Sequence, residues 1–141
     1  MSHLIFRLRS ARTGIDQLLK DIGGAMTLNP GARMTVHTRD ASNDTPLHYA
    51  AYWGDVRAIE ILAAAGAEID ACGAYGATPL FNAVANGHYA AAARLLDLGA
   101  SPHEESALGS AARAAAKSDD ARIRALFCTA EANPRHFTPA R

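Results

Sequence analysis

Cysteine is scarce in this sequence, and no long hydrophobic run is present. Only Cys72 and Cys128 occur among the 141 residues, without a Cys or His at metal-ligand spacing beside them, so neither a disulfide framework nor a zinc site is expected. No segment approaches the roughly 18 to 20 apolar residues that span a bilayer, and the first residues lack the apolar centre of a secretory signal. These absences predict a cytoplasmic protein without stable membrane insertion.

Motifs for catalysis and for cofactor binding are also missing. The sequence has no glycine-rich phosphate loop, no nucleophile elbow and no Cys/His pair with a third orienting group. Its six histidines are scattered, without the i, i+4 pairing or the carboxylate neighbour that a metal site or a general base needs. The sequence therefore predicts a protein that is not an enzyme, with no catalytic residue, no metal and no cofactor.

Charge of both signs is present in equal amount, but it is divided unevenly along the chain. Residues 1–39 carry six basic side chains against two acidic ones, residues 40–105 carry two against nine, and residues 106–141 carry six against three. An acidic middle favours a protein partner with a basic surface and disfavours nucleic acid, because a phosphate backbone needs a positive surface. The alternative is that these acids form only a solvated face. Arginine outnumbers lysine twelve to two, which fits a bacterial source.

The chain contains an internal repeat with a period of 33 residues. Residues 45–72 (TPLHYAAYWGDVRAIEILAAAGAEIDAC) align without a gap on residues 78–105 (TPLFNAVANGHYAAAARLLDLGASPHEE). In each copy Thr-Pro predicts the start of a helix, since threonine can cap it and proline suits its first turn. A glycine then ends this short helix, and helical spacing of apolar residues predicts a second one.

One such pair of helices cannot cover its own apolar face, so neighbouring copies must stack. The stack is predicted to share one hydrophobic seam through Leu47, Leu62, Leu80 and Leu95. Upstream, Ile15, Leu18, Leu19 and Ile22 have helical spacing, and downstream Ile123, Leu126 and Phe127 form a similar stripe. The basic arm with Arg7, Arg9 and Arg12 is expected to pack on the first repeat, or alternatively to contact a membrane or another anionic surface weakly.

The period and the TPLHYAA motif resemble the ankyrin repeat, and the likeness is strong over residues 40–105. It implies an all-α ankyrin-repeat solenoid, with helix-turn-helix repeats joined by hairpin turns and degenerate capping repeats at both ends. We expect a single domain over residues 1–132, with a degenerate N-terminal cap at 1–40, repeats at 41–72 and 73–105, a C-terminal cap repeat at 106–132 and a flexible tail at 133–141. In the C-terminal cap, Ser106-Ala107-Leu108 stands where Thr-Pro-Leu is expected, after a shortened turn.

The resemblance also implies which residues contact a partner. Tyr52 and Trp53 end the first helix, and in similar proteins those positions face the concave groove. The contact positions carried over to both copies are Ala41, Ser42, Asp44, Tyr52, Trp53, Ala74, Tyr75, Ala77, Ala85 and Asn86. Three of the nine aromatic residues fall in this set, and aromatic anchors dominate many interfaces. The alternative for Trp53 is packing on the segment Ala25–Asp44; His48 is implied to hydrogen-bond the backbone of the adjoining turn.

These features predict a non-catalytic protein-binding module that recognises a basic protein through the hairpin tips and the concave groove. An immunity or antitoxin-type inhibitor of a basic toxin is one specific version. The alternative is a self-assembling scaffold built by stacking of repeat ends. The chain itself is expected to be a monomer or a weak oligomer.

Overall fold

The structure is a computed structural model that describes residues 14–26, 28 and 31–132, the last four of them as helix backbone. The basic arm with Arg7, Arg9 and Arg12 and the tail at 133–141 lie outside the described residues. Within the described part the chain forms seven α-helices and one short 3-10 turn, without a β-strand. The predicted all-α class is therefore confirmed.

The helices form where the repeat predicts them. Thr45 and Thr78 are the N-cap residues of the first helix in each of the two repeat copies. The Thr78 hydroxyl accepts a hydrogen bond from the Phe81 backbone N–H. Gly54 ends the first of these helices in the left-handed region, with φ 72°, which glycine adopts without strain. The helices are α2 (Ile15–Gly23), α3 (Pro46–Trp53), α4 (Val56–Ala64), α5 (Pro79–Ala85), α6 (Tyr89–Asp97), α7 (Ala111–Ala116) and α8 (Ala121–Ala132).

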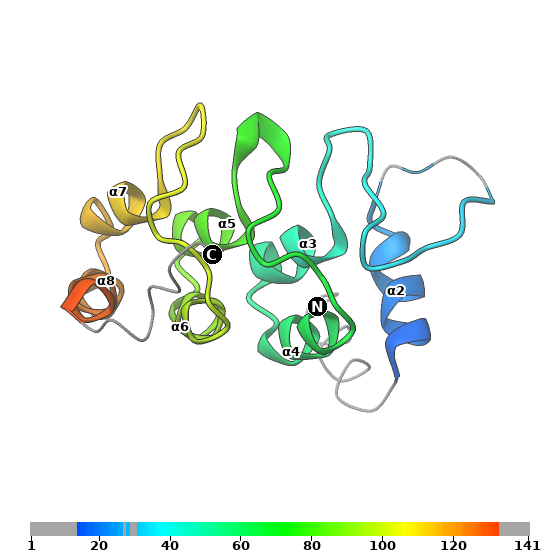
Figure 1. Ribbon diagram of the computed structural model, residues 1–141, viewed down its shortest axis with the longest axis horizontal. Helices are drawn as coiled ribbons and strands as arrows, with labels where there is room; N and C mark the ends of the chain where they lie inside the picture. The colour runs from blue at the N-terminus through cyan, green and yellow to red at the C-terminus, as the bar shows by residue number, and fades with distance from the viewer. Residues whose placement is uncertain (1–13, 27, 29–30, 133–141) are drawn as a thin grey trace.

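The helices stack in two rows. The inner helices α3, α5 and α7 lie side by side, and the outer helices α4, α6 and α8 form a second row below them in Figure 1, away from the hairpins, while α2 packs against both α3 and α4 at one end. The loops before α3, α5 and α7 project to the same side as three hairpins (Figure 1). This arrangement is an ankyrin-repeat solenoid, and it leaves an inner surface between the hairpins and the inner helices.

One continuous hydrophobic core runs through both rows. The four leucines of the predicted seam are completely buried, which confirms the prediction: Leu47, Leu62, Leu80 and Leu95. The core extends to the end helices through Leu18 and Ile22 of α2 and through Ile123 and Phe127 of α8.

The predicted alignment of the C-terminal cap was wrong by four residues. Ser110, and not Ser106, caps α7, and its hydroxyl accepts a hydrogen bond from the Arg113 backbone N–H. Ser106 instead closes the third hairpin, where its N–H donates to the Gly109 carbonyl at 3.2 Å. The corresponding hydrogen bond of the second hairpin joins the Gly73 N–H to the Ala77 carbonyl, which are four residues apart instead of three. The third hairpin is therefore one residue shorter than the second, and the deletion lies in its tip and not directly before the helix.

Candidate partner-binding surface

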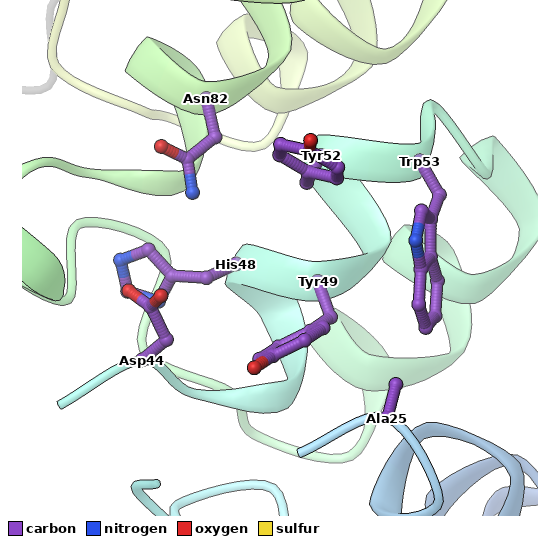
Figure 2. Close-up of a pocket in the computed structure, with 7 residues that line it drawn as sticks. All are labelled: Ala25, Asp44, His48, Tyr49, Tyr52, Trp53 and Asn82. Atoms are coloured by element: carbon purple, nitrogen blue, oxygen red, sulfur yellow. The ribbon is translucent and has the colours of Figure 1, made fainter. Parts of the chain in front are cut away.

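The inner surface contains a cavity of about 350 Å³ next to α3. Four of its lining residues come from α3, and the wall is completed by Asn82 of α5, by Asp44 just before α3 and by Ala25 after α2 (Figure 2). The residues from α3 are His48, Tyr49, Tyr52 and Trp53. The cavity thus brings together three segments that are distant in the sequence.

The predicted contact residues differ in their accessibility. Tyr52 is 52% exposed and Tyr75 is 72% exposed, which is unusual for large apolar side chains in this molecule. Asp44, Trp53 and Ala74 are half-buried. The other exposed members of the set are Ala41, Ser42, Ala85 and Asn86.

Ala77 is an exception among the predicted contacts, because its side chain is buried, with 4% exposed. Its carbonyl oxygen lies 2.9 Å from His48 Nε2. Ala77 therefore supports the second hairpin from inside and offers no side-chain surface to a partner.

His48 connects one repeat to the next. Its Nδ1 accepts a hydrogen bond from the Thr45 backbone N–H at 3.1 Å, so Nε2 carries the proton that is donated to the Ala77 carbonyl. Burial lowers the pKa of His48 below its usual value, which keeps the ring neutral near pH 7. The hydrogen bond to the adjoining turn that the resemblance implied is confirmed, and it is a structural role.

Trp53 is partly buried against the hydrophobic core, and its ring meets that of Tyr49 edge-on, with centroids 5.7 Å apart. Figure 2 shows the indole beside Ala25 while it also lines the cavity. The two interpretations of Trp53 are thus compatible: it packs at the N-terminal end and presents one face to the inner surface.

Tyr49 is a cavity residue that the sequence reasoning missed. Its hydroxyl donates a 2.6 Å hydrogen bond to the Asp40 carboxylate, and burial together with that carboxylate raises the pKa of Tyr49. The available signal was the spacing of Tyr49, Tyr52 and Trp53 at i, i+3 and i+4, which places three aromatic side chains on one face of a helix.

Hydrogen bonds join the hairpins to one another. Arg39 in the first hairpin donates to the Cys72 carbonyl at 2.7 Å, and the Asp44 carboxylate accepts from the Ala74 N–H at 2.9 Å. The second hairpin is linked to the third by the N–H of Ala107, which donates to the Tyr75 carbonyl. The tips therefore form one connected edge rather than three independent loops.

Two exposed apolar side chains lie on neighbouring hairpin tips. Tyr75 adopts φ 59°, a left-handed conformation that is strained for a bulky residue. Leu108, in the third hairpin, is 56% exposed. Leu108 was not among the predicted contact residues, because its alignment with Leu80 placed it at a helix start. We call Tyr75 and Leu108 the hairpin-tip pair.

The acidic residues of the middle segment divide into buried and exposed ones. Asp55 is only 1% exposed and caps α4 by accepting from the Ala58 N–H, so it does not contribute to the surface. Asp70 is half-buried, and burial together with the nearby negative charges of Glu104 and Glu68 raises its pKa. Glu68 and Glu104 themselves are exposed. Asp70, Glu68 and Glu104 therefore lie near one another, in the loops before α5 and α7.

Two absences in the described part of the chain concern metal binding and membrane insertion. No cluster of three or more His, Cys, Asp or Glu residues that could hold a metal ion occurs in the described part of the chain. Among residues 14–26, 28 and 31–132 no helix is long and apolar enough to cross a bilayer.

Comparison with known proteins identifies the class. The family described as ankyrin repeats (3 copies) matches residues 12–106, which are 95 of the 141 residues. The chain belongs to the ankyrin-repeat family. It is also similar to the ARF GTPase-activating protein Git of Drosophila melanogaster, with 49% identity over 53 residues. That match covers 38% of this chain and 7% of the relative.

The family defines the general role of the surface. Ankyrin repeats are protein-interaction modules and are typically non-catalytic. The chain spans 7% of this relative's length, and the GTPase-activating role in the relative's name belongs to that protein.

Proposed function

We propose that this chain is a non-catalytic binding module that recognises one protein partner through the hairpin-tip pair and the inner surface around Tyr52. The observation that carries the proposal is the exposure of three large apolar side chains, Tyr52, Tyr75 and Leu108, all on hairpins or on an inner helix. Exposed aromatic and aliphatic anchors supply much of the energy at protein interfaces.

The conformation of Tyr75 gives the proposal a specific test. In the left-handed region a tyrosine is disfavoured relative to glycine, so Tyr75→Gly is expected to raise the free energy of unfolding by about 1 kcal/mol. Urea denaturation would measure this gain. The same substitution removes an exposed ring, so it is expected to weaken partner binding at least about tenfold.

To measure partner binding, the wild-type chain is immobilised and used to capture a protein from extracts of the source cells. The captured protein is then titrated with each variant. Leu108→Ala is expected to weaken binding as well, while Arg57→Ala, on the outer helix α4, serves as the matched surface control. If Tyr75→Gly and Leu108→Ala bind the captured protein as tightly as the wild type does, the proposed surface is wrong. If no partner is captured and light scattering shows a molar mass that increases with protein concentration, the self-assembling scaffold is favoured instead.

The charge in the loops before α5 and α7 supports a partner with a basic surface. Burial, and after it the nearby charges of Glu104 and Glu68, raise the pKa of Asp70, and a basic partner would offset the repulsion among these three acids on binding. In its most specific form the proposal is an immunity-type inhibitor of a basic toxin in a bacterial cytoplasm. The free and exposed thiols of Cys72 and Cys128 fit a reducing compartment.

Asp70→Asn tests whether this acid is retained at the expense of stability. Because the pKa of Asp70 is raised in the folded state, its ionised form favours the unfolded chain, and the associated stability is lost as pH rises through the folded pKa. Asparagine keeps the oxygen that accepts from the Ser101 N–H. The substitution is expected to stabilise the fold at pH 7 by less than about 1 kcal/mol, since water screens a half-exposed group.

The measurement is urea denaturation at pH 7 and at pH 3. A gain at pH 7 that disappears at pH 3 is the expected pattern, because the wild-type carboxyl is then protonated in both states. An equal effect at both pH values would mean that charge is not its cause.

A further inference from the structure

Three aromatic side chains line one space on the inner surface. Tyr49, Tyr52 and Trp53 all come from α3 and all line the 350 Å³ cavity (Figure 2). The rings of Tyr49 and Trp53 contact each other at 65° between their planes, so they form two walls and not one stacked layer. We call this space the aromatic cavity.

The repeat itself indicates that these rings are not needed for stacking one repeat on the next. The equivalent positions of the next copy, 33 residues later, are Asn82, Ala85 and Asn86. That copy still forms helix α5 and packs between α3 and α7. Stacking of the repeats therefore does not by itself require an aromatic residue at any of the three positions.

The charge beside the aromatic cavity is negative. Asp44 lines it, and the carboxylate of Asp40 accepts the hydrogen bond of the Tyr49 hydroxyl. Burial lowers the pKa of His48, so this ring adds no positive charge. Arg39 is exposed, donates to the carbonyls of Asn43 and Cys72, and is near enough for its charge to contribute to lowering the pKa of His48, so two carboxylates stand against this one cation. Aromatic faces with adjacent carboxylates attract an organic cation.

The hydrogen bonds already present restrict which cation fits. Both Asp40 oxygens accept hydrogen bonds, one from the Ser42 and Asp44 N–H groups and the other from Tyr49. Asp44 Oδ1 accepts from the Ala74 N–H, and both His48 ring nitrogens are engaged. A primary ammonium has three N–H donors and a guanidinium has five, and each donor needs an acceptor when it leaves water. Asp44 Oδ2, the Asn82 side-chain oxygen and the Tyr52 hydroxyl remain as acceptors in the lining, so an ammonium would need all three and a guanidinium would exceed them. A cation that has no N–H group avoids this requirement.

We propose that the aromatic cavity binds the quaternary ammonium group of a trimethylated lysine on the partner protein. The proposal rests on the proposed function, because the lysine belongs to the partner. It deepens that function by naming the side chain that the inner surface recognises: the methylated head group lies among Tyr49, Tyr52 and Trp53, and the carboxylates of Asp40 and Asp44 supply the opposite charge.

The chain carries its own reporter for this site, because Trp53 is the only tryptophan. We would titrate the full chain with acetylated and amidated trimethyllysine and follow Trp53 fluorescence. Three ligands serve as comparisons: the same compound with unmethylated lysine, the one with arginine, and a neutral analogue with a tert-butyl group in place of the trimethylammonium. Trimethyllysine is expected to bind at least about fivefold more tightly than each of them.

Two variants localise the binding. Tyr52→Ala removes an exposed ring of the cavity and is expected to weaken trimethyllysine binding about tenfold, while Arg57→Ala, at an exposed position of the outer helix α4, leaves it unchanged. Asp44→Asn keeps the oxygen that accepts from Ala74 and removes the charge, so a smaller loss, of about threefold, is expected.

Each other outcome overturns the proposal. If the tert-butyl analogue binds equally well, the cavity selects an apolar group and not a cation. If arginine or unmethylated lysine binds more tightly, the cavity recognises a different cation. If no ligand changes the Trp53 fluorescence, the site does not exist. Because this titration needs no partner, its failure is separable from that of the proposed function, which is measured on the hairpin-tip variants.

Discussion

His48→Phe is expected to lower the free energy of unfolding at pH 7 by about 2 to 4 kcal/mol. Phenylalanine occupies the equivalent position of the next copy as Phe81, so a ring of this kind is compatible with the helix. The loss comes from hydrogen bonding: without the imidazole, the buried Thr45 N–H loses its acceptor at 3.1 Å and the Ala77 carbonyl loses its donor at 2.9 Å. Urea denaturation of both proteins measures the difference.

The same variant is expected to remove a pH dependence. Since burial lowers the pKa of His48 from its usual 6.5 in the folded state, protonation favours the unfolded chain. The stability is complete above pH 6.5 and is lost as pH falls from there through the lower folded pKa. Protonation would also place a hydrogen on Nδ1, where it conflicts with the Thr45 N–H.

The control for this titration is His37→Phe, at an exposed position in the first hairpin. We expect His37→Phe to keep the wild-type decrease in stability between pH 7 and pH 5, and His48→Phe to flatten it. If both variants follow the wild-type curve, a different group controls the acid sensitivity, and the role assigned to the His48 ring is wrong.

The solenoid could be predicted from the sequence because its signals are local and occur twice. Thr-Pro at each helix start, glycine at each helix end and the seam leucines depend only on the chemistry of a few neighbouring residues. Two copies at a fixed offset then imply that they stack, and the complete burial of Leu47 and Leu80 agrees with this.

The surface was harder to predict because it depends on contacts between hairpins. Ala77 belongs to a position that contacts partners in similar proteins, but here its side chain is buried and its carbonyl faces His48 from the preceding repeat. Leu108 was missed because Ser106 was aligned with Thr78, which assumed a loop shortened by five residues, whereas Ser110 follows Thr78 by 32 positions and the loop is shorter by one residue only. No periodicity along the chain reports such a deletion.

The cavity residues illustrate a second limit. Tyr49 could have been found from its spacing to Tyr52 and Trp53, but its bond to Asp40 joins the helix to a hairpin nine residues earlier. The shape of the cavity also depends on Ala25, which follows α2 and has no counterpart in the repeat alignment. Contacts of this kind are set by how the elements pack and not by local patterning.

Leu80→Ala is expected to cause the largest loss of stability, about 3 to 5 kcal/mol. Leu80 is completely buried in α5, and this helix packs against α3 on one side and α7 on the other. Removing its side chain deletes buried apolar area and leaves a cavity that neighbouring helices cannot fill without moving. Leu108→Ala makes the same chemical change at an exposed site and is expected to alter stability by less than about 0.5 kcal/mol.

The position of α5 also determines how the unfolding transition should look. In a solenoid each repeat contacts only its neighbours, so α5 connects the helices before it to those after it. Trp53 fluorescence reports on α3, whereas circular dichroism reports on all helices. In the wild type the two signals should change at the same urea concentration, as a cooperative transition requires. In Leu80→Ala both midpoints should fall, and a loss no larger than that of Leu108→Ala would mean that the two rows of helices do not share the seam at Leu80.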